Sequence, residues 1–381
     1  MTVDLLIRNG TVIDPARKHH ALGNVAIANG RIVDVGGGAV DGRIEIDAQG
    51  CLVVPGLIDF HAHVFAGGTS MGVRADPNCL PQGVTTVVDA GSAGLANYRN
   101  FVDTAVAFNE MRVFSLVNVS PTGIVTGHYP ENVDPRHYDA DALVRLFARY
   151  PGQLLGLKVR LGREIVGELG LRPLQATLEI AGRIGCQVVV HVTNAPCTQD
   201  KITELLRPGD VFCHCFHRAG PTIIGEDGRV LPGIREARAR GVIFDACNGR
   251  SNFGFPPAKA ALADGFAPDI ISTDLTAMTA YMSYAFGLPY LMSKYLSLGL
   301  GLDEVVAACT VAPAKQLRKA GELGTLAPGA LADVAVLKQV AKPMRYIDSA
   351  SEVFLGDVAL VPQMTVLGGR IVYRQLDFST H

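Results

Sequence analysis

The chain has 381 residues, of which 48% are hydrophobic and 18% are charged, and its formal net charge is −2. This composition supplies a large buried core and argues against extensive disorder. A charge this close to zero gives no general attraction to nucleic acid or to acidic membranes, so we expect neither as a partner. The amino terminus lacks a signal-peptide pattern and no uncharged apolar run reaches about eighteen residues, which predicts a cytoplasmic protein. The eight cysteines are scattered and are expected to be mostly small, reduced core residues.

Both ends of the chain have the pattern of short β-strands. Strands are expected at 3–8, 11–14, 24–28, 31–35, 44–48 and 52–54, with tight turns at Asn9-Gly10 and Asn29-Gly30. The same pattern of short strands is found at 332–337 and 364–373, with a turn at Gly368-Gly369. Neither end is long enough to close a large core alone. We therefore expect the two ends, residues 1–54 and 326–381, to pair into one small composite β-sandwich, with boundaries near Pro55-Gly56 and Pro328-Gly329.

Residues 55–325 instead alternate between apolar strands and helical stretches. Eight short apolar runs are found, at 57–61, 85–90, 113–119, 154–160, 187–192, 211–216, 242–246 and 270–274. Helices are clearest at 173–184, at 232–240 and from 303 onward. This pattern predicts an α/β fold in which the middle of the chain forms a (β/α)8 TIM barrel. The long loop 120–138 is expected to be a lid or pocket wall, with His128 and Tyr129 as lid residues.

Metal-competent side chains fall at the ends of several of these strands. His61 and His63 are two positions apart on one strand, so both side chains point to the same side. Single candidates follow on later strands: Lys158, His191, His214 and Asp274. Because the carboxyl ends of barrel strands meet at one rim, all six are expected to face one mouth. An isolated His-x-His is weak evidence, but scattered core residues have no reason to share this position on so many strands.

This set of residues resembles the amidohydrolase superfamily, and the resemblance covers nearly the whole chain. The motifs Gly156-Leu-Lys-Val-Arg160, His191-Val-Thr-Asn-Ala-Pro196 and Ser272-Thr-Asp-Leu275 are similar to its dihydroorotase-like or amidohydrolase/deacetylase branch. The resemblance implies two divalent metal ions, with Zn²⁺ favoured and Mn²⁺ or Fe²⁺ still open. It also implies that His61, His63 and Asp274 bind one metal and that His191 and His214 bind the other.

Lys158 would join both metals, because the resemblance implies that carbon dioxide converts its amine into an anionic carbamate. Burial makes a neutral amine available for that reaction. The alternative is a lysine that extends to the rim or pairs with a carboxylate. The implied reaction is attack of a metal-bridging hydroxide on a substrate carbonyl, with Asp274 as the catalytic residue that takes the proton and delivers it to the leaving atom.

Five further residues are candidates for substrate binding. Arg160 could hold a substrate carboxylate, or could equally form a salt bridge with an acid at the rim. Hydrogen bonds to substrate are expected from Thr193 and Asn194. His217 could contact substrate, support a ligand or be a solvated loop residue. Asn248 stands where similar proteins have a histidine, which weakens an inherited substrate preference.

Two aspartates and three histidines receive other assignments. Asp89 and Asp245 could orient a ligand histidine, although capping of the following helix is slightly preferred. His19, His20 and His137 are expected at the surface.

The substrate class follows from the branch and from Arg160. Sequences similar to dihydroorotases have the motif His-x-His-x-Arg on the first strand, and the arginine takes the substrate carboxylate. This chain has Phe65 at that position, so cyclic amide hydrolysis remains only an alternative. Removal of an acyl group, acetyl first, from a small carboxylate-bearing amide or ester is the better supported prediction; examples are an N-acyl amino acid and an acetylated 2-hydroxy acid. A non-catalytic structural barrel is the alternative of another class, and a homo-oligomer is possible.

Overall fold

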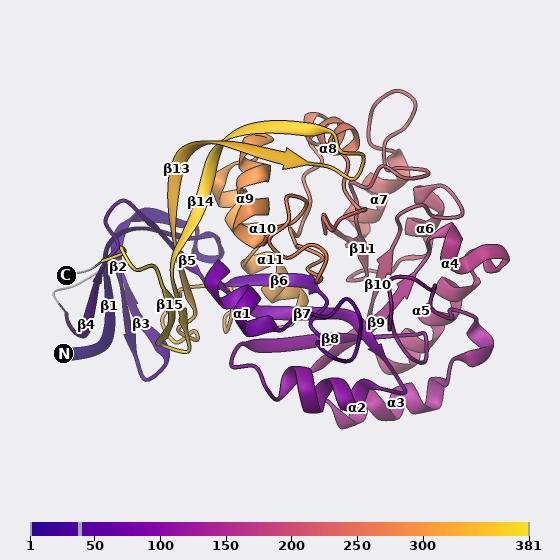
Figure 1. Ribbon diagram of the computed structural model, residues 1–381, viewed down its shortest axis with the longest axis horizontal. Coiled ribbons are helices and arrows are strands. Elements are labelled where there is room, and N and C mark those ends of the chain that lie inside the picture. The colour runs from indigo at the N-terminus through magenta and orange to yellow at the C-terminus, as the bar shows by residue number, and fades with distance from the viewer. Residues whose placement is uncertain (1, 37–39, 380–381) are drawn as a thin grey trace.

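The structure consists of two sheets built from different parts of the chain (Figure 1). The computed structural model describes residues 2–36 and 40–379. Residues 1, 37–39 and 380–381, which belong to the predicted terminal module, lie outside the described residues. One sheet combines strands from both ends of the chain, and the other is a curved, all-parallel sheet from its middle. The protein therefore has a mixed α/β fold.

Eight strands from the two ends form the first sheet, in the order β15-β14-β13-β5-β1-β2-β3 with β4 paired to β1. The bounds are β1 Thr2–Asp14, β2 His19–Ala28, β3 Arg31–Val35, β4 Asp41–Asp47, β5 Leu52–Pro55, β13 Val334–Ile347, β14 Val353–Leu367 and β15 Arg370–Arg374. The antiparallel pairing of β13 with β5 joins the end of the chain to its beginning. The expected pairing of the two termini is thus present as a single sheet.

Two of the three predicted turns are confirmed and one is wrong. Asn29-Gly30 joins β2 to β3 and Gly368-Gly369 joins β14 to β15, and all four residues have positive φ. At Asn9-Gly10, however, β1 continues without a break, and its register against β2 shifts between Ile7 and Gly10. The positive φ of Asn9 therefore produces a bulge within one strand, and a side chain on Gly10 would clash with Val53 of β5.

A buried carboxylate further ties the two ends of the chain together. The side chain of Asp14, at the end of β1, is fully buried and accepts hydrogen bonds from Thr325 Oγ1 and the Leu326 amide, both at 2.8 Å. Beside it, apolar residues from both ends form a common core, including Val12, Val53 and Val334.

The second sheet follows chain order from β6 to β12, and every neighbouring pair is parallel. Its strands are β6 Leu57–Ala62, β7 Val84–Gly94, β8 Arg112–Asn118, β9 Leu154–Arg160, β10 Gln187–His191, β11 Val211–Cys213 and β12 Ile243–Asp245. Seven of the eight predicted runs are therefore strands. Because the order is sequential and each strand is parallel to the next, the sheet curls and its carboxyl ends share one edge.

The eighth run, residues 270–274, differs from the expectation because it is not a continuous strand. It makes only isolated bridges, from Ile270 to Asp245 of β12 and from Leu275 to Ala62 of β6. Asp274 has a φ of 55°, a conformation that interrupts a regular ladder, although its amide still donates to the His61 carbonyl at 2.8 Å. The segment thus lies between the first and last strands of the parallel sheet.

Helices between the strands pack on the outside of the curved sheet (Figure 1). They are α1 Ala75–Cys79, α2 Tyr98–Phe101, α3 Ala140–Arg149, α4 Arg163–Val166, α5 Arg172–Ile184, α6 Gln199–Leu205, α7 Pro232–Arg240, α8 Phe255–Ala263, α9 Leu288–Ser297, α10 Leu302–Ala308 and α11 Val311–Gln316. Further helical turns occupy 15–17, 80–82, 102–106, 135–137 and 167–169. The helices predicted at 173–184, at 232–240 and from 303 agree with α5, α7 and α10 to within one residue. Within the described part of the chain, none of the helices has the length and apolarity needed to cross a membrane.

The hairpin of β13 and β14 reaches far beyond the first sheet. Figure 1 shows it arching from that sheet over α9 towards α8. The Leu360 amide of β14 donates to Ser293 Oγ of α9 at 2.8 Å, and Arg218 pairs with Asp348 at the far end of the hairpin. The hairpin therefore connects the sheet of the termini to the edge of the parallel sheet where the strands end.

Candidate metal centre

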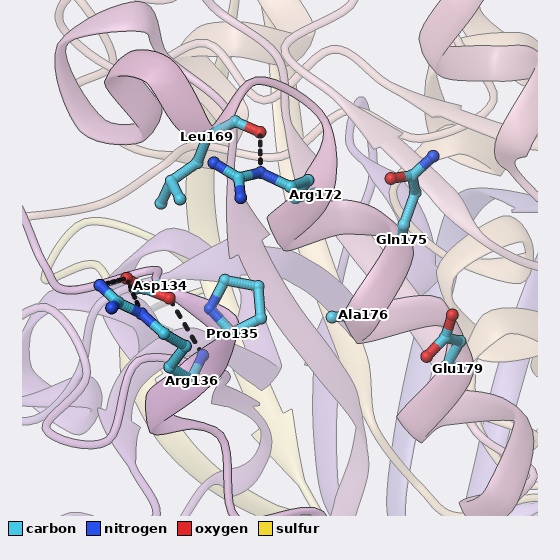
Figure 2. A pocket seen from close by; sticks show the side chains of 8 residues that line it. All are labelled: Asp134, Pro135, Arg136, Leu169, Arg172, Gln175, Ala176 and Glu179. Atoms are coloured by element: carbon cyan, nitrogen blue, oxygen red, sulfur yellow. Dashed lines mark hydrogen bonds and ion pairs between the residues drawn. The ribbon is translucent and has the colours of Figure 1, made fainter.

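A cavity of about 790 Å³ opens at the carboxyl ends of the parallel strands. It is lined by most of the site residues predicted from the sequence: His61, His63, Lys158, Arg160, His191, Thr193, His214 and Asp274. Residues 124 and 126–130 of the long loop, including His128 and Tyr129, form part of its wall. A second hollow, between residues 134–136 and α5, contains none of the predicted site residues (Figure 2). The chemistry-bearing side chains are therefore gathered at one place.

Three of these side chains form a group that we call the open cluster: His61, His63 and Asp274. One ligand atom from each lies within 4.8 Å of the others. Asp274 Oδ1 is 3.3 Å from His63 Nε2 and 3.7 Å from His61 Nε2. Nitrogen and carboxylate donors at this spacing fit a single divalent cation with little rearrangement.

The other three predicted ligands lie next to the open cluster. The rings of His191 and His214 have centroids 4.5 Å apart, and the ring of His214 lies 5.3 Å from that of His61. Lys158 is 1% exposed, and its Nζ is 3.4 Å from His61 Nε2. It neither extends to the rim nor forms a salt bridge with any carboxylate of the described residues. Its amine is thus buried beside His61, in the cavity that the other three histidines also line.

The electrostatic environment keeps the histidines in the form that binds metals. Burial lowers the pKa of His61 and His191 well below the ordinary value, and it lowers the pKa of His214 to about 3. These rings are therefore neutral at physiological pH, as a metal ligand must be. Burial alone would raise the pKa of Asp274, but its hydrogen bond with His63 and the nearby His214 and Lys158 hold that pKa below the usual range. The donor set thus combines neutral imidazoles with an anionic carboxylate, which suits a divalent cation.

Several groups that the sequence analysis missed hold the predicted ligands in place. Ser92 Oγ lies 2.8 Å from His63 Nδ1, and the Cys247 carbonyl oxygen lies 2.7 Å from His214 Nδ1. Asn252 Nδ2 donates to Asp274 Oδ2 at 2.9 Å. Such contacts fix the ring orientation and leave Nε2 free for a metal. No local motif identifies these partners, because each comes from a strand or loop remote from its ligand.

Asp89 and Asp245 support the ligand-bearing segments, so their preferred assignment as helix caps is wrong. Asp89 accepts from the amides of Val64 and Ser92, each at 2.8 Å. Asp245 accepts from Ser272 Oγ at 2.7 Å and lies 3.9 Å from His61 Nδ1. Burial raises the pKa of Asp89, and it raises the pKa of Asp245 to about 7.

Of the five candidates for substrate binding, two line the cavity. Arg160 Nη1 donates to Glu131 Oε2 at 2.9 Å, so the salt bridge considered from the sequence is present. A guanidinium has five N–H groups, and the pair with Glu131 leaves others available. Thr193 is buried at the cavity wall, and its Oγ1 has no hydrogen-bond partner among the described residues.

The other three candidates do not line the cavity. Asn194 Nδ2 donates to Glu164 at 3.1 Å. His217 is fully buried behind the wall, 3.1 Å from Gln199 Nε2, so it is not a solvated loop residue. Asn248 is fully buried and accepts a hydrogen bond from Lys294. Each of these side chains is held by the protein itself.

Comparisons with known proteins agree with this geometry. The model of the amidohydrolase family matches residues 52–372. A deacetylase of Agrobacterium fabrum is 32% identical over 329 residues, which are 86% of this chain and 80% of that protein. A crystal structure of an adenine deaminase has a TM-score of 0.89 at 28% identity and covers 98% of this chain and 100% of its own. A crystal structure of a dihydroorotase has a TM-score of 0.86 at 29% identity and covers 99% of each chain. The chain described here belongs to the amidohydrolase family.

Proposed function

We propose that this chain is a binuclear metal-dependent hydrolase that removes an acyl group, acetyl first, from a small carboxylate-bearing amide or ester. N-acyl amino acids and acetylated 2-hydroxy acids are examples of the proposed substrates. The observation that carries the proposal is the convergence of four buried histidines, Lys158 and Asp274 on one cavity. The similarity to a deacetylase supports acyl removal within the family.

The proposed roles of the residues follow from their positions. His61, His63 and Asp274 would hold one cation, His191 and His214 a second, and Lys158, as its carbamate, both. When bound, two divalent cations such as Zn²⁺ make water more acidic and polarise a carbonyl. Asp274 would accept the proton from the attacking water and pass it to the leaving nitrogen or oxygen. Arg160 would hold the substrate carboxylate through the N–H groups that Glu131 does not use.

We propose the same division of the chain that the sequence predicts. Residues 55–325 would form a (β/α)8 barrel that carries the site. Segment 270–275 would take the place of the eighth strand, between β12 and β6. Residues 1–54 and 326–381 would form the composite β-sandwich. The bridges from residues 270 and 275 and the pairing of β13 with β5 support this division.

Hydrolysis of a cyclic amide has less support than deacylation. Sequences similar to dihydroorotases have an arginine at the position of Phe65. The ring of Phe65 is buried and packs edge to face against Phe101, with the ring centroids 5.4 Å apart. Phe65 does not line the cavity. The cation available to a substrate carboxylate is therefore Arg160, and not a residue at position 65.

The test is hydrolysis of a small library after metal removal and after Zn²⁺ is restored. The library contains N-acetyl amino acids of both hands, acetylated 2-hydroxy acids, dihydroorotate and, as a matched control, acetylated amines that lack a carboxylate. We expect hydrolysis of the acetylated acids only, its loss on chelation and its return with Zn²⁺. A Zn²⁺-loaded protein that hydrolyses none of these compounds would favour a non-catalytic structural barrel.

A further inference from the structure

Two thiols that the proposed function does not use lie beside the open cluster. Cys213 is the last residue of β11, and Cys247 follows β12 by two positions. Both are fully buried. Together with His61 and His214 they form what we call the thiol cluster, in which one ligand atom from each residue lies within 4.8 Å of all the others.

His61 lies between the two clusters and turns one ring nitrogen towards each. Its Nδ1 is 3.1 Å from Cys213 Sγ, whereas its Nε2 is 3.7 Å from Asp274 Oδ1. A neutral imidazole carries a lone pair on only one nitrogen, and the other nitrogen carries the proton. His61 can therefore ligate a cation in one cluster at a time.

The two clusters differ in the cations that they favour. The open cluster supplies nitrogen and carboxylate oxygen beside a cavity, whereas the thiol cluster supplies two sulfurs and two nitrogens in a closed interior. Two sulfurs and two nitrogens are a tetrahedral donor set that thiophilic cations prefer. Two thiolates also neutralise a divalent cation, so the filled cluster would bury no net charge.

Both cysteines belong to an apolar cluster, so packing accounts for their burial, but packing does not account for the polar groups beside them. Cys213 Sγ contacts both a ligand histidine and Lys158 Nζ, the latter at 3.7 Å. Cys247 holds a φ of 32°, which is an uncommon conformation for a residue with a side chain. By contrast, the thiol of the buried Cys309 donates to the Ile271 carbonyl, and this residue packs in the main apolar core.

We propose that the thiol cluster is a metal site separate from the two of the proposed function, for a thiophilic divalent cation such as Cd²⁺, which draws His61 and His214 away from those two sites. Binding breaks two S–H bonds, forms two sulfur–cation bonds and releases two protons to solvent, with no change in oxidation state. Of the residues in the open cluster, a cation held there leaves His63 and Asp274, and it also takes His214 from its pairing with His191. Thiophilic cations should therefore inhibit by diverting a ligand, without touching the substrate.

The test is titration of the metal-free full-length protein with Cd²⁺, followed by ultraviolet thiolate-to-cadmium charge-transfer absorption. We expect the wild-type band to saturate at one thiolate-bound Cd²⁺ per chain. Cys213→Ser and Cys247→Ser should each weaken the band and lower Cd²⁺ affinity by more than about tenfold, since even loss of a group that supports a ligand costs that much. The matched control is Cys186→Ser, at the amino end of β10, which should keep the wild-type band.

Two results would overturn the inference: no charge-transfer band in the wild type, or an unchanged band in both serine variants. Circular dichroism establishes that each variant is folded. If a variant does not fold, the Co²⁺ spectrum of the wild type decides, because thiolate charge transfer appears only when sulfur is a ligand. None of these readouts uses a substrate, so failure here and failure of the proposed hydrolysis are distinguished.

Discussion

The predicted ligands differ from ordinary core histidines in what surrounds them. His61 and His214 are each only 1–2% exposed, yet they adjoin a lysine, an aspartate and other histidines instead of purely apolar side chains. A set of polar groups this deeply buried is costly unless something else balances it. A pair of bound cations would provide that balance.

Asp274 has two roles in the proposed site, and its substitution separates them. Asp274→Asn keeps the shape of the side chain but removes the group that would carry a proton. We expect kcat to fall by about 10²–10⁴, the range for a general acid or base. Asn252→Ala, which removes only the neutral donor to Asp274, is the comparison and should cost less. Activity of Asp274→Asn within a few-fold of the wild type would contradict the assignment.

Arg160 is expected to determine recognition of the carboxylate. Arg160→Met should raise KM for an acetylated acid by about 10–100-fold, since a hydrogen bond to a charged group contributes about 1.5–3 kcal/mol. The value of kcat should change less, because the carboxylate is remote from the reacting carbonyl. Arg163→Met is the control, because Arg163 binds the Ala195 carbonyl and does not line the cavity. Equal KM values for the Arg160 and Arg163 variants would exclude the role.

At this scale the sequence predicts the ligands better than their surroundings. All six predicted ligands, which the sequence places at strand ends, line the cavity, because strand ends converge in any such sheet. Asn194 and Asn248 were misplaced because their side chains turn to Glu164 and Lys294, contacts that no spacing rule contains. Cys213 is a buried free thiol in an apolar cluster, as expected of a small core residue.

Among the elements, α9 carries a lysine whose burial has a measurable consequence. Lys294 is fully buried, donates to Asn248 and lies 3.7 Å from the centre of the Phe253 ring. Burial lowers its pKa to about 7 from an ordinary value of 10.5. The unfolded chain therefore binds more protons than the folded one between these values, and stability should rise with pH through this window.

We expect this lysine to add about 2 kcal/mol to the free energy of unfolding between pH 7 and pH 9. The measurement is denaturant unfolding of the Zn²⁺-loaded protein at both pH values. Lys294→Met should lose this increment, whereas Lys259→Met, at an exposed position of α8, should keep it. An identical pH dependence in Lys294→Met and the wild type would show that Lys294 is not the cause.

The elements were predictable where local pattern and tertiary structure agree. The seven regular strands of the parallel sheet and the helices α5 and α7 follow directly from hydrophobic periodicity. The eighth run has the same apolar pattern, but Asp274 adopts a left-handed conformation and interrupts the ladder. Asn9-Gly10 has a hairpin signal that the neighbouring strands override, which produces a bulge.

For the whole molecule, the two ends of the chain are expected to fold as one unit. Asp14→Ala removes the acceptor for Thr325 and for the Leu326 amide, which then remain buried without partners. We expect the free energy of unfolding to fall by about 1–3 kcal/mol. Asp357→Ala, at an exposed position of β14, is the control and should change it by less than about 0.5 kcal/mol. Equal effects of the two substitutions would argue against this link.

The pairing of the termini could be inferred because neither end can bury its apolar face alone. The reach of the β13–β14 hairpin to the cavity could not be inferred, since its length and its contacts with α9 depend on the assembled fold. Ser349 and Ser351 lie in the turn between β13 and β14, at the far end of that hairpin, and both line the cavity. The sequence therefore predicts the candidate metal ligands of the cavity but not all the residues that line it.

The most direct test of the central claim is a crystal structure of the Zn²⁺-loaded protein with anomalous data collected at the zinc edge. We predict two zinc peaks, one beside His61, His63 and Asp274 and one beside His191 and His214, with carbamate density on Lys158 between them. Zinc peaks elsewhere in the molecule, or a bare amine at Lys158 with both peaks present, would contradict the account.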